Sequence, residues 1–233
     1  MYIVSRYIDN PLLVGGKKFD LRLYVLVTSW QPLQAYIHRS GFARFCAVPY
    51  TALSSTRSAQ RDLDNLYMHL TNVSIQKHGA EYSVTHGGKW PLECLRAHLK
   101  ASQGEQATAR CFGAIRSLIR HSLLAVQPSM ASGLGCFELY GYDVMLDAEL
   151  KPWLIEVNAS PSLTATTAAD KRRKTRLVGD TLDIVMPHTR PMAPAVGAPE
   201  AVAGSGAAAV WGGGEGAPTW HPSRMPEFEL LMD

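Results

Sequence analysis

The apolar positions in the first part of the chain predict strands. Residues 19–29, FDLRLYVLVTS, are rich in apolar and β-branched side chains and follow Asn-Pro and Gly-Gly turn signals. Residues 33–37 and 42–48 are typical of antiparallel neighbours of this strand. We therefore expect a sheet that is at least partly a meander, followed by a polar loop over residues 52–62.

Farther along, the apolar spacing changes to that of helices. Leucines predict a short helix over residues 90–100, and a continuous apolar stripe predicts a longer one over residues 105–126. A closing helix is expected over residues 168–186, with a basic run at residues 171–176. Strands, then helices, then a late hairpin indicate an α+β fold, with a mainly antiparallel sheet packed with helices.

The late hairpin is predicted by two runs of alternating apolar residues, 139–146 and 153–157, around the polar turn 147–151. Asp143 lies inside the first strand. A turn centred near residue 149 places Asp143 roughly opposite residues 155 and 156.

Two carboxylates and an amide oxygen therefore converge on this hairpin. Glu156 and Asn158 are two residues apart, so they project from one face of the sheet, within cross-strand reach of Asp143. Like charges in a half-buried sheet repel each other and are costly to desolvate, so a cation is the natural compensation. An all-oxygen set suits Mg²⁺ that keeps waters and holds phosphates. The alternative is a strand-end Asp and Glu that face solvent.

Charged residues also alternate along the first long strand. Lys18, Asp20 and Arg22 share one face, and the intervening apolar residues share the other. The charged face could be an exposed edge. The apolar residues that follow favour an interior strand, where paired charges that also meet phosphates are more plausible.

Four further polar residues are less specific. Arg44, between two phenylalanines, is either a rigid fork for a carboxylate or a surface arginine stacked on a ring. Thr71 and Asn72 at a loop tip, and Lys89 after two glycines, can bind an anionic ligand. Taken alone, they fit capping and turn roles.

The composition divides the chain at residue 190. Residues 191–233 hold seven Gly, nine Ala and six Pro and one Arg against five acids, which predicts a disordered tail. Its last stretch, residues 228–232, is either a docking motif or, as we favour, a frayed end. The chain carries a net charge of +3 and this tail −4, so residues 1–190 carry +7. That surplus favours an anionic partner such as a nucleotide or an acidic peptide.

Other classes of protein are disfavoured. No apolar run is long enough to span a bilayer and no secretory signal is visible, so we expect an intracellular protein without a membrane partner. Four widely separated cysteines predict buried thiols rather than zinc ligands or disulfides. No nucleic-acid partner is expected.

Five motifs, in order, resemble the catalytic domain of the tubulin tyrosine ligase-like family, most closely its polyglutamylase members. They are KKFDLRLYVLV, GFARF, HLTNVSIQK, GGKW and FELYGYDVMLD…LKPWLIEVNASPSL, and the resemblance covers about residues 3–186. It implies an ATP-grasp fold, in which two α+β lobes hold ATP between them. Only about four residues precede the first matching segment, so we expect the amino-terminal lobe to be missing and residues 1–190 to form an incomplete catalytic region.

The resemblance also implies roles for individual residues. The family usually has Gln-Lys where Ser5-Arg6 stand in its adenine-hinge segment. The implied nucleotide contacts are Ser5, Arg6, Tyr7, Ile8, Lys18, Asp20, Arg22, Thr71 and Asn72; the implied glutamate contacts are Arg44 and Lys89; and the implied Mg²⁺ ligands are Asp143, Glu156 and Asn158. Among these, Arg44, Lys89 and Glu156 are the implied catalytic residues.

The implied activity is an ATP- and Mg²⁺-dependent tubulin polyglutamylase. Such an enzyme joins free L-glutamate by isopeptide bonds to glutamate side chains in the acidic tails of tubulin, through an acyl phosphate. Microtubules, accessory polyglutamylase subunits, and a place in the cytoplasm, cytoskeleton and cilium (flagellar axoneme or basal body) follow from the same resemblance. Transfer of glycine or tyrosine is an alternative with the same chemistry. A non-catalytic subunit that binds tubulin or assembles a complex is the second alternative, because of the missing lobe.

Overall fold

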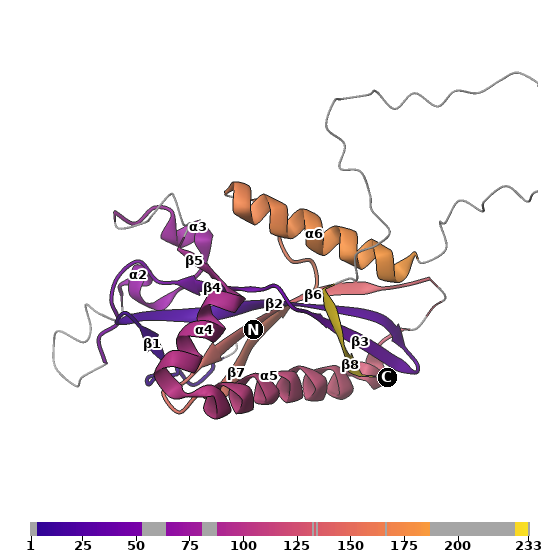
Figure 1. The fold of residues 1–233 in the computed structure, drawn as a ribbon, viewed down its shortest axis with the longest axis horizontal. Coiled ribbons are helices and arrows are strands. Elements are labelled where there is room, and N and C mark those ends of the chain that lie inside the picture. Colours follow the sequence, from indigo (N-terminus) through magenta and orange to yellow (C-terminus); the bar gives the residue numbers. More distant parts are fainter. Residues whose placement is uncertain are drawn as a thin grey trace, which may run out of the picture.

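A long central strand organises the fold (Figure 1). The computed structural model describes residues 4–52, 64–80, 88–131, 133, 135–165, 167–186 and 227–232. The strands are β1 (Leu13–Val14), β2 (Lys17–Trp30), β3 (Leu33–His38), β4 (Phe42–Phe45), β5 (Lys89–Pro91), β6 (Glu138–Leu146), β7 (Pro152–Asn158) and β8 (Phe228–Met232). The helices are α2 (Leu66–His69), α3 (Val73–Gln76), α4 (Leu92–Gln103), α5 (Glu105–Val126), the 3₁₀ turn η1 (Gln127–Ser129) and α6 (Ala168–Val185).

Strand β2 has neighbours on both edges. Along one edge, its first part pairs with β4 and its second part with β3, while β6 runs along the other edge. The sheet continues from β4 to β5, from β3 to β8 and from β6 to β7. Every strand pair within the described residues is antiparallel. The predicted α+β fold with a mainly antiparallel sheet is therefore confirmed.

Helices lie on both faces of the sheet (Figure 1). The apolar face of β2 packs against the buried stripes of α4 and α5 and forms the main core. On the opposite face, Leu177 of α6 packs against Tyr24 and Phe42. The polar residues of β2 therefore lie between the sheet and α6, on the side away from the main core.

The predicted helices and hairpin are all present. Helix α5 has the predicted bounds, while α6 ends at Val185 and the last predicted strand of the meander, β4, ends at Phe45 rather than residue 48. The amide of Cys46 still donates to the carbonyl of Lys18 at 2.9 Å, but the amide of Ala47 donates to the side chain of Gln76 at 2.8 Å, so the pairing with β2 does not continue beyond Cys46. The predicted polar loop lies almost entirely outside the described residues.

Two sequence-based interpretations are wrong. Residues 228–232 are not a frayed end, because they form β8 and pair with the free edge of β3. Residues 191–226 and 233 of the predicted tail lie outside the described residues. All four cysteines are free, but Cys94 and Cys136 are exposed, so burial is confirmed only for Cys46 and Cys111. No helix within the described residues has the length and apolar content to cross a membrane.

Candidate functional site

The charged face of β2 is buried. Lys18, Asp20 and Arg22 are only 3%, 4% and 9% exposed, while the alternate residues of the strand enter the main core. The strand is therefore interior, as predicted. A buried charge is costly unless it is paired, so the partners of these three residues define the site.

Arg44 joins two aspartates at the centre of this face. It lies opposite Asp20 in the β2–β4 register, and its Nε donates to Asp20 Oδ1 at 2.7 Å. Its Nη2 donates to Asp20 Oδ2 and also to Asp143 Oδ2, the latter at 2.7 Å. Arg44 is 7% exposed. The surface-arginine interpretation is therefore wrong, and the guanidinium is a fork that binds the carboxylates of Asp20 and Asp143.

Asp143 also accepts hydrogen bonds from a second arginine. Arg22 lies opposite it in the β2–β6 register and donates from Nε and Nη2 at 2.6 and 3.0 Å. Burial by itself would raise the pKa of Asp143, but the hydrogen bonds and charges of Arg22 and Arg44 outweigh it and lower the pKa. Asp143 is therefore held as a carboxylate, and part of the charge compensation that the sequence assigned to a metal ion comes from arginine.

The hairpin brings the three predicted oxygen ligands together. Asp143 lies directly opposite Glu156, and an irregularity in the pairing follows, between Asp143 and Val144. Asn158 lies opposite Gly141, and its Nδ2 donates to Glu156 Oε1 at 3.2 Å and to Gly141 O at 3.3 Å. Glu156 is exposed, unlike Asp143. The three side chains thus extend from the buried arginine network, at Asp143, to the surface, at Glu156.

A cationic cavity of about 400 Å³ opens beside Arg22 and Arg44. Lys89 of β5 lines it, with its Nζ 4.9 Å from the centre of the Phe42 ring. Lys174 of α6 also lines it. The remaining lining residues are Asn72, Val73, Ser74, Lys77, Ser162 and Thr164. Because five cationic side chains line the cavity, it suits an anion with more than one carboxylate or phosphate group.

Asp170 holds the two lysines in place. Its Oδ2 accepts hydrogen bonds from Lys89 Nζ at 2.9 Å and from Lys174 Nζ at 3.4 Å. Lys174 also donates to the carbonyl of Thr164. Burial lowers the pKa of Lys174, while Asp170 opposes that shift. Asp170 itself is placed by the start of α6, where its amide donates to the side chain of the N-cap Thr167 at 3.1 Å.

The predicted nucleotide contacts fall into two groups. Tyr7 lies against Lys18, whose Nζ donates to the Tyr7 hydroxyl at 3.0 Å, and that hydroxyl also hydrogen-bonds His69 at 2.7 Å. Burial lowers the pKa of Lys18. Ser5 and Arg6 are exposed, and Ile8 is half-buried. The structure thus joins Tyr7 to the charged strand.

Thr71 and Asn72 are brought to the site by a short loop between α2 and α3. Thr71 is buried and donates to Asp20 Oδ2 at 2.7 Å, whereas Asn72 is exposed and lines the cavity. Asn72 occupies the N-cap position of α3, but its side chain makes no capping bond. Gln76, 2% exposed, fixes the loop by donating to the carbonyls of Tyr67 and Leu70.

The model of the tubulin-tyrosine ligase family matches residues 1–193. The chain belongs to this family. It is similar to a probable alpha-tubulin polyglutamylase Ttll1 of Tetrahymena thermophila, with 50% identity over 80% of this chain and 44% of that protein. It is also similar to a probable tubulin polyglutamylase TTLL9 of Bos taurus (48% identity; 79% of this chain, 38% of that protein) and to the human tubulin polyglutamylase TTLL5 (37%; 78% and 15%). The chain therefore spans less than half the length of these relatives.

The oxygen cluster of Asp143, Glu156 and Asn158 can be compared with the ligands that Mg²⁺ prefers. The three donors are two carboxylates and an amide, which is the ligand chemistry of Mg²⁺. Asn158 uses its Nδ2 for hydrogen bonds, which leaves its carbonyl oxygen for a cation. Both oxygens of Asp143 accept from arginines, but a carboxylate has about four acceptor positions. The residues therefore fit the ion.

Sequence reasoning did not identify several of the residues that line the cavity of this tubulin-tyrosine ligase family member. Lys174 was included only as part of the basic run at residues 171–176 of the closing helix, with no role assigned, yet it is 8% exposed. A lysine one turn after Asp170, which follows the N-cap Thr167, was the available signal. Lys77, Ser162 and Thr164 carry no comparable signal, because only the fold brings their loops to the cavity.

Proposed function

We propose that this chain is part of the catalytic domain of an ATP- and Mg²⁺-dependent tubulin polyglutamylase, with an ATP-grasp-like fold. The observation that carries the proposal is the cavity in which Arg44, Lys89 and Lys174 converge, adjoining the carboxylate cluster through Asp143. The names of the relatives support tubulin as the protein substrate. A cytoskeletal and ciliary location and accessory subunits belong to the same proposal.

In this proposal the two halves of the site bind different ligands. Lys18, Tyr7 and Thr71 contact the nucleotide, and Asp143, Glu156 and Asn158 hold the magnesium ion. When bound, Mg²⁺ would neutralise charge between phosphate oxygens. Asp20 and Arg22 act through the ion-pair network, since Asp20 accepts from Arg44 and Arg22 donates to Asp143.

The cationic cavity binds free glutamate. The γ-carboxylate of a glutamate in a tubulin tail first takes the terminal phosphoryl group of ATP, which gives an acyl phosphate and ADP. The α-amine of free glutamate then attacks the acyl carbon, and phosphate leaves. Arg44, Lys89 and Lys174 hold the carboxylates of the free amino acid, so the second step becomes effectively intramolecular. The two carboxylates of glutamate explain why a cavity lined by several cations suits it better than glycine or tyrosine.

The test is ATP-dependent incorporation of labelled L-glutamate into tubulin by the longest product of the gene, with Mg²⁺ present. We expect incorporation by the unchanged protein and none above background for Glu156→Gln. Glu149→Gln is the matched control, because Glu149 lies in the turn of the same hairpin and accepts only from Asn10, at 3.0 Å, among the contacts of the described residues.

Three outcomes would contradict the proposal or its details. Full incorporation by Glu156→Gln would remove the assigned metal site. Unlabelled glycine or tyrosine that competes better than glutamate would change the amino-acid substrate. Tubulin binding without any transfer would favour the non-catalytic alternative.

A further inference from the structure

The last described segment of the chain, residues 227–232, lies along the edge of β3. Phe228 lies opposite His38 and Glu229 opposite Ile37 in an antiparallel register. The amide of Arg39 extends the pairing by donating to the carbonyl of Glu227 at 2.7 Å. In sequence, residues 186–226 separate this segment from α6, and the family match ends at residue 193. The segment is therefore an addition to the family domain that uses a free sheet edge.

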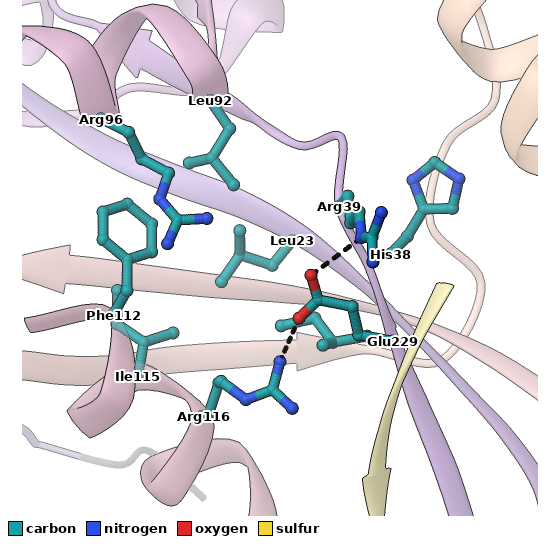
Figure 2. Close-up of a pocket in the computed structure, with 10 residues that line it drawn as sticks. Leu23, His38, Arg39, Leu92, Arg96, Phe112, Ile115, Arg116 and Glu229 are labelled. Carbon is teal, nitrogen blue, oxygen red and sulfur yellow. Dashed lines mark hydrogen bonds and ion pairs between the residues drawn. The ribbon is translucent and has the colours of Figure 1, made fainter. Parts of the chain in front are cut away.

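Two arginines from different elements bind the carboxylate of Glu229 (Figure 2). Arg39, directly after β3, donates from Nε to Oε1 at 2.8 Å, and Arg116 of α5 donates from Nη1 to Oε2 at 2.5 Å. Arg116 also donates from Nη2 to the carbonyl of Leu230 at 2.9 Å. The arginines therefore recognise both a carboxylate and the backbone of an extended segment.

Glu227 is recognised from the opposite side of the sheet, by α6 and the β3–β4 turn. Arg176 Nη2 lies 2.6 Å from Glu227 Oε1, and the Ser40 hydroxyl donates to Oε2 at 3.2 Å. The amide of Glu227 donates to Asp180 Oδ2 at 3.0 Å, and that oxygen is also 3.1 Å from His38 Nε2. The buried Asp180 thus binds the backbone of the segment just before β8.

The apolar contacts of the segment are limited. The Phe228 ring meets the His38 ring edge-on, with centroids 4.6 Å apart, and packs against the cluster that contains Leu177. Leu231 and Met232 pack against the main core. None of the residues 227–232 is fully buried. A half-exposed strand held by an edge, by carboxylate contacts and by a few apolar side chains has the character of a bound peptide.

The surface beside the segment holds further positive charge. A hollow of about 470 Å³ is lined by four arginines and three glutamates: Arg39, Arg96, Arg173, Arg176, Glu93, Glu227 and Glu229. Arg96 stacks on the Phe112 ring at 4.2 Å, and within the described part of the chain it makes no ion pair with a carboxylate. Arg96 and Arg39 both line a neighbouring cavity (Figure 2). The surroundings of the segment thus favour acidic ligands.

We propose that the edge of β3 is a docking site for an extended acidic peptide with carboxylates on both sides of an aromatic residue. Residues 227–232 occupy it as an exchangeable ligand of the chain itself. Because the segment is covalently attached, it has a high effective concentration and competes with any separate peptide. Weakening the attached segment therefore opens the site to a peptide added in solution.

The experiment measures binding of a fluorescent peptide with the sequence of residues 223–233, by anisotropy, to the full chain. The released variant carries Glu227→Ala and Glu229→Ala, which weaken the attached segment and leave the β3 edge intact. We expect this variant to bind the peptide at least about tenfold more tightly than the unchanged chain. Equal affinities for the two chains would overturn the proposal.

Arginine variants of the released chain test the recognition. Arg116→Ala should lower the affinity for the peptide by about tenfold, because it loses the contacts to Glu229 and Leu230. Arg120→Ala, one turn along the same helix and exposed, is the matched control and should change nothing. Equal effects of the two substitutions would contradict the assigned contact.

Two further measurements keep the test independent of folding. Thermal unfolding of each variant shows whether it is folded. If the Arg116→Ala variant is unfolded, the test is repeated with Arg39→Ala, because the side chain of Arg39 is 63% exposed. A peptide with alanine at both glutamate positions should not bind the released chain. Binding of that peptide as tight as binding of the parent would overturn the selectivity for carboxylates.

Discussion

At the scale of single residues, Arg44 links the two parts of the candidate site. It donates to Asp20 and to Asp143. Asp20 also accepts a hydrogen bond from Thr71, and Asp143 lies opposite Glu156 in the hairpin. Burial alone would lower the pKa of Arg44, but the two aspartates outweigh it and raise the pKa. The guanidinium is therefore a permanent charge whose removal affects two carboxylates at once.

We expect Arg44→Ala to destabilise the chain by about 3–5 kcal/mol, because it leaves two buried carboxylates with less compensation. Urea unfolding at neutral pH measures the loss. Arg120→Ala, on an exposed position of α5, is the control and should cost less than about 0.5 kcal/mol. A loss of similar size for both variants would show that the buried network adds little stability.

Asp143 predicts a pH dependence of stability. Its pKa is lower in the folded chain than the value of about 3.9 expected for an unfolded aspartate. Asp143 therefore adds stability that is present above that value and is lost as the pH falls through the folded pKa. Urea unfolding between about pH 2 and pH 6 should show a steeper loss in the unchanged chain than in Asp143→Asn, which cannot titrate there. Parallel curves for the two chains would contradict this assignment.

At the scale of elements, the sequence predicts the strands and helices that the local pattern of apolar residues determines. The long strand, α4, α5, α6 and the hairpin follow from periodicity, and the bounds differ by a few residues at most. The pattern of Lys18, Asp20 and Arg22 also predicted the buried charged face. Strand β8 was missed because a short acidic segment becomes a strand only on the edge of β3, about 190 residues away in sequence. Lys174 was missed for a similar reason, since only the packing of α6 shows which face of that helix is buried.

Helix α6 supports the site through one apolar contact. Leu177 is 2% exposed and packs against Tyr24 and Phe42, one turn from Lys174. We expect Leu177→Ala to destabilise the chain by about 2–4 kcal/mol, because neighbouring side chains only partly fill the space that the leucine side chain leaves. Leu182→Ala is the matched control on the same helix, 40% exposed, and should cost less than about 1 kcal/mol. Chemical unfolding of both variants checks the difference, and equal losses would mean that α6 is not held at Leu177.

At the scale of the whole molecule, the sheet and α6 meet at the cationic cavity. Strands β4 and β5 contribute Arg44 and Lys89, and α6 contributes Lys174, with Asp170 bridging the two lysines. A ligand that bridges these elements binds the folded chain and not the unfolded one. It must therefore stabilise the fold by mass action.

We therefore expect L-glutamate to raise the unfolding temperature of the unchanged chain. At about 100 times its dissociation constant, the stabilisation should reach about 2.7 kcal/mol. Glycine, which lacks the side-chain carboxylate, should have a smaller effect at the same concentration. Lys89→Ala should remove most of the shift, whereas Lys171→Ala, on the exposed face of α6, should leave it unchanged. If glutamate shifts the Lys89→Ala chain as much as the unchanged chain, the amino acid does not bind in this cavity.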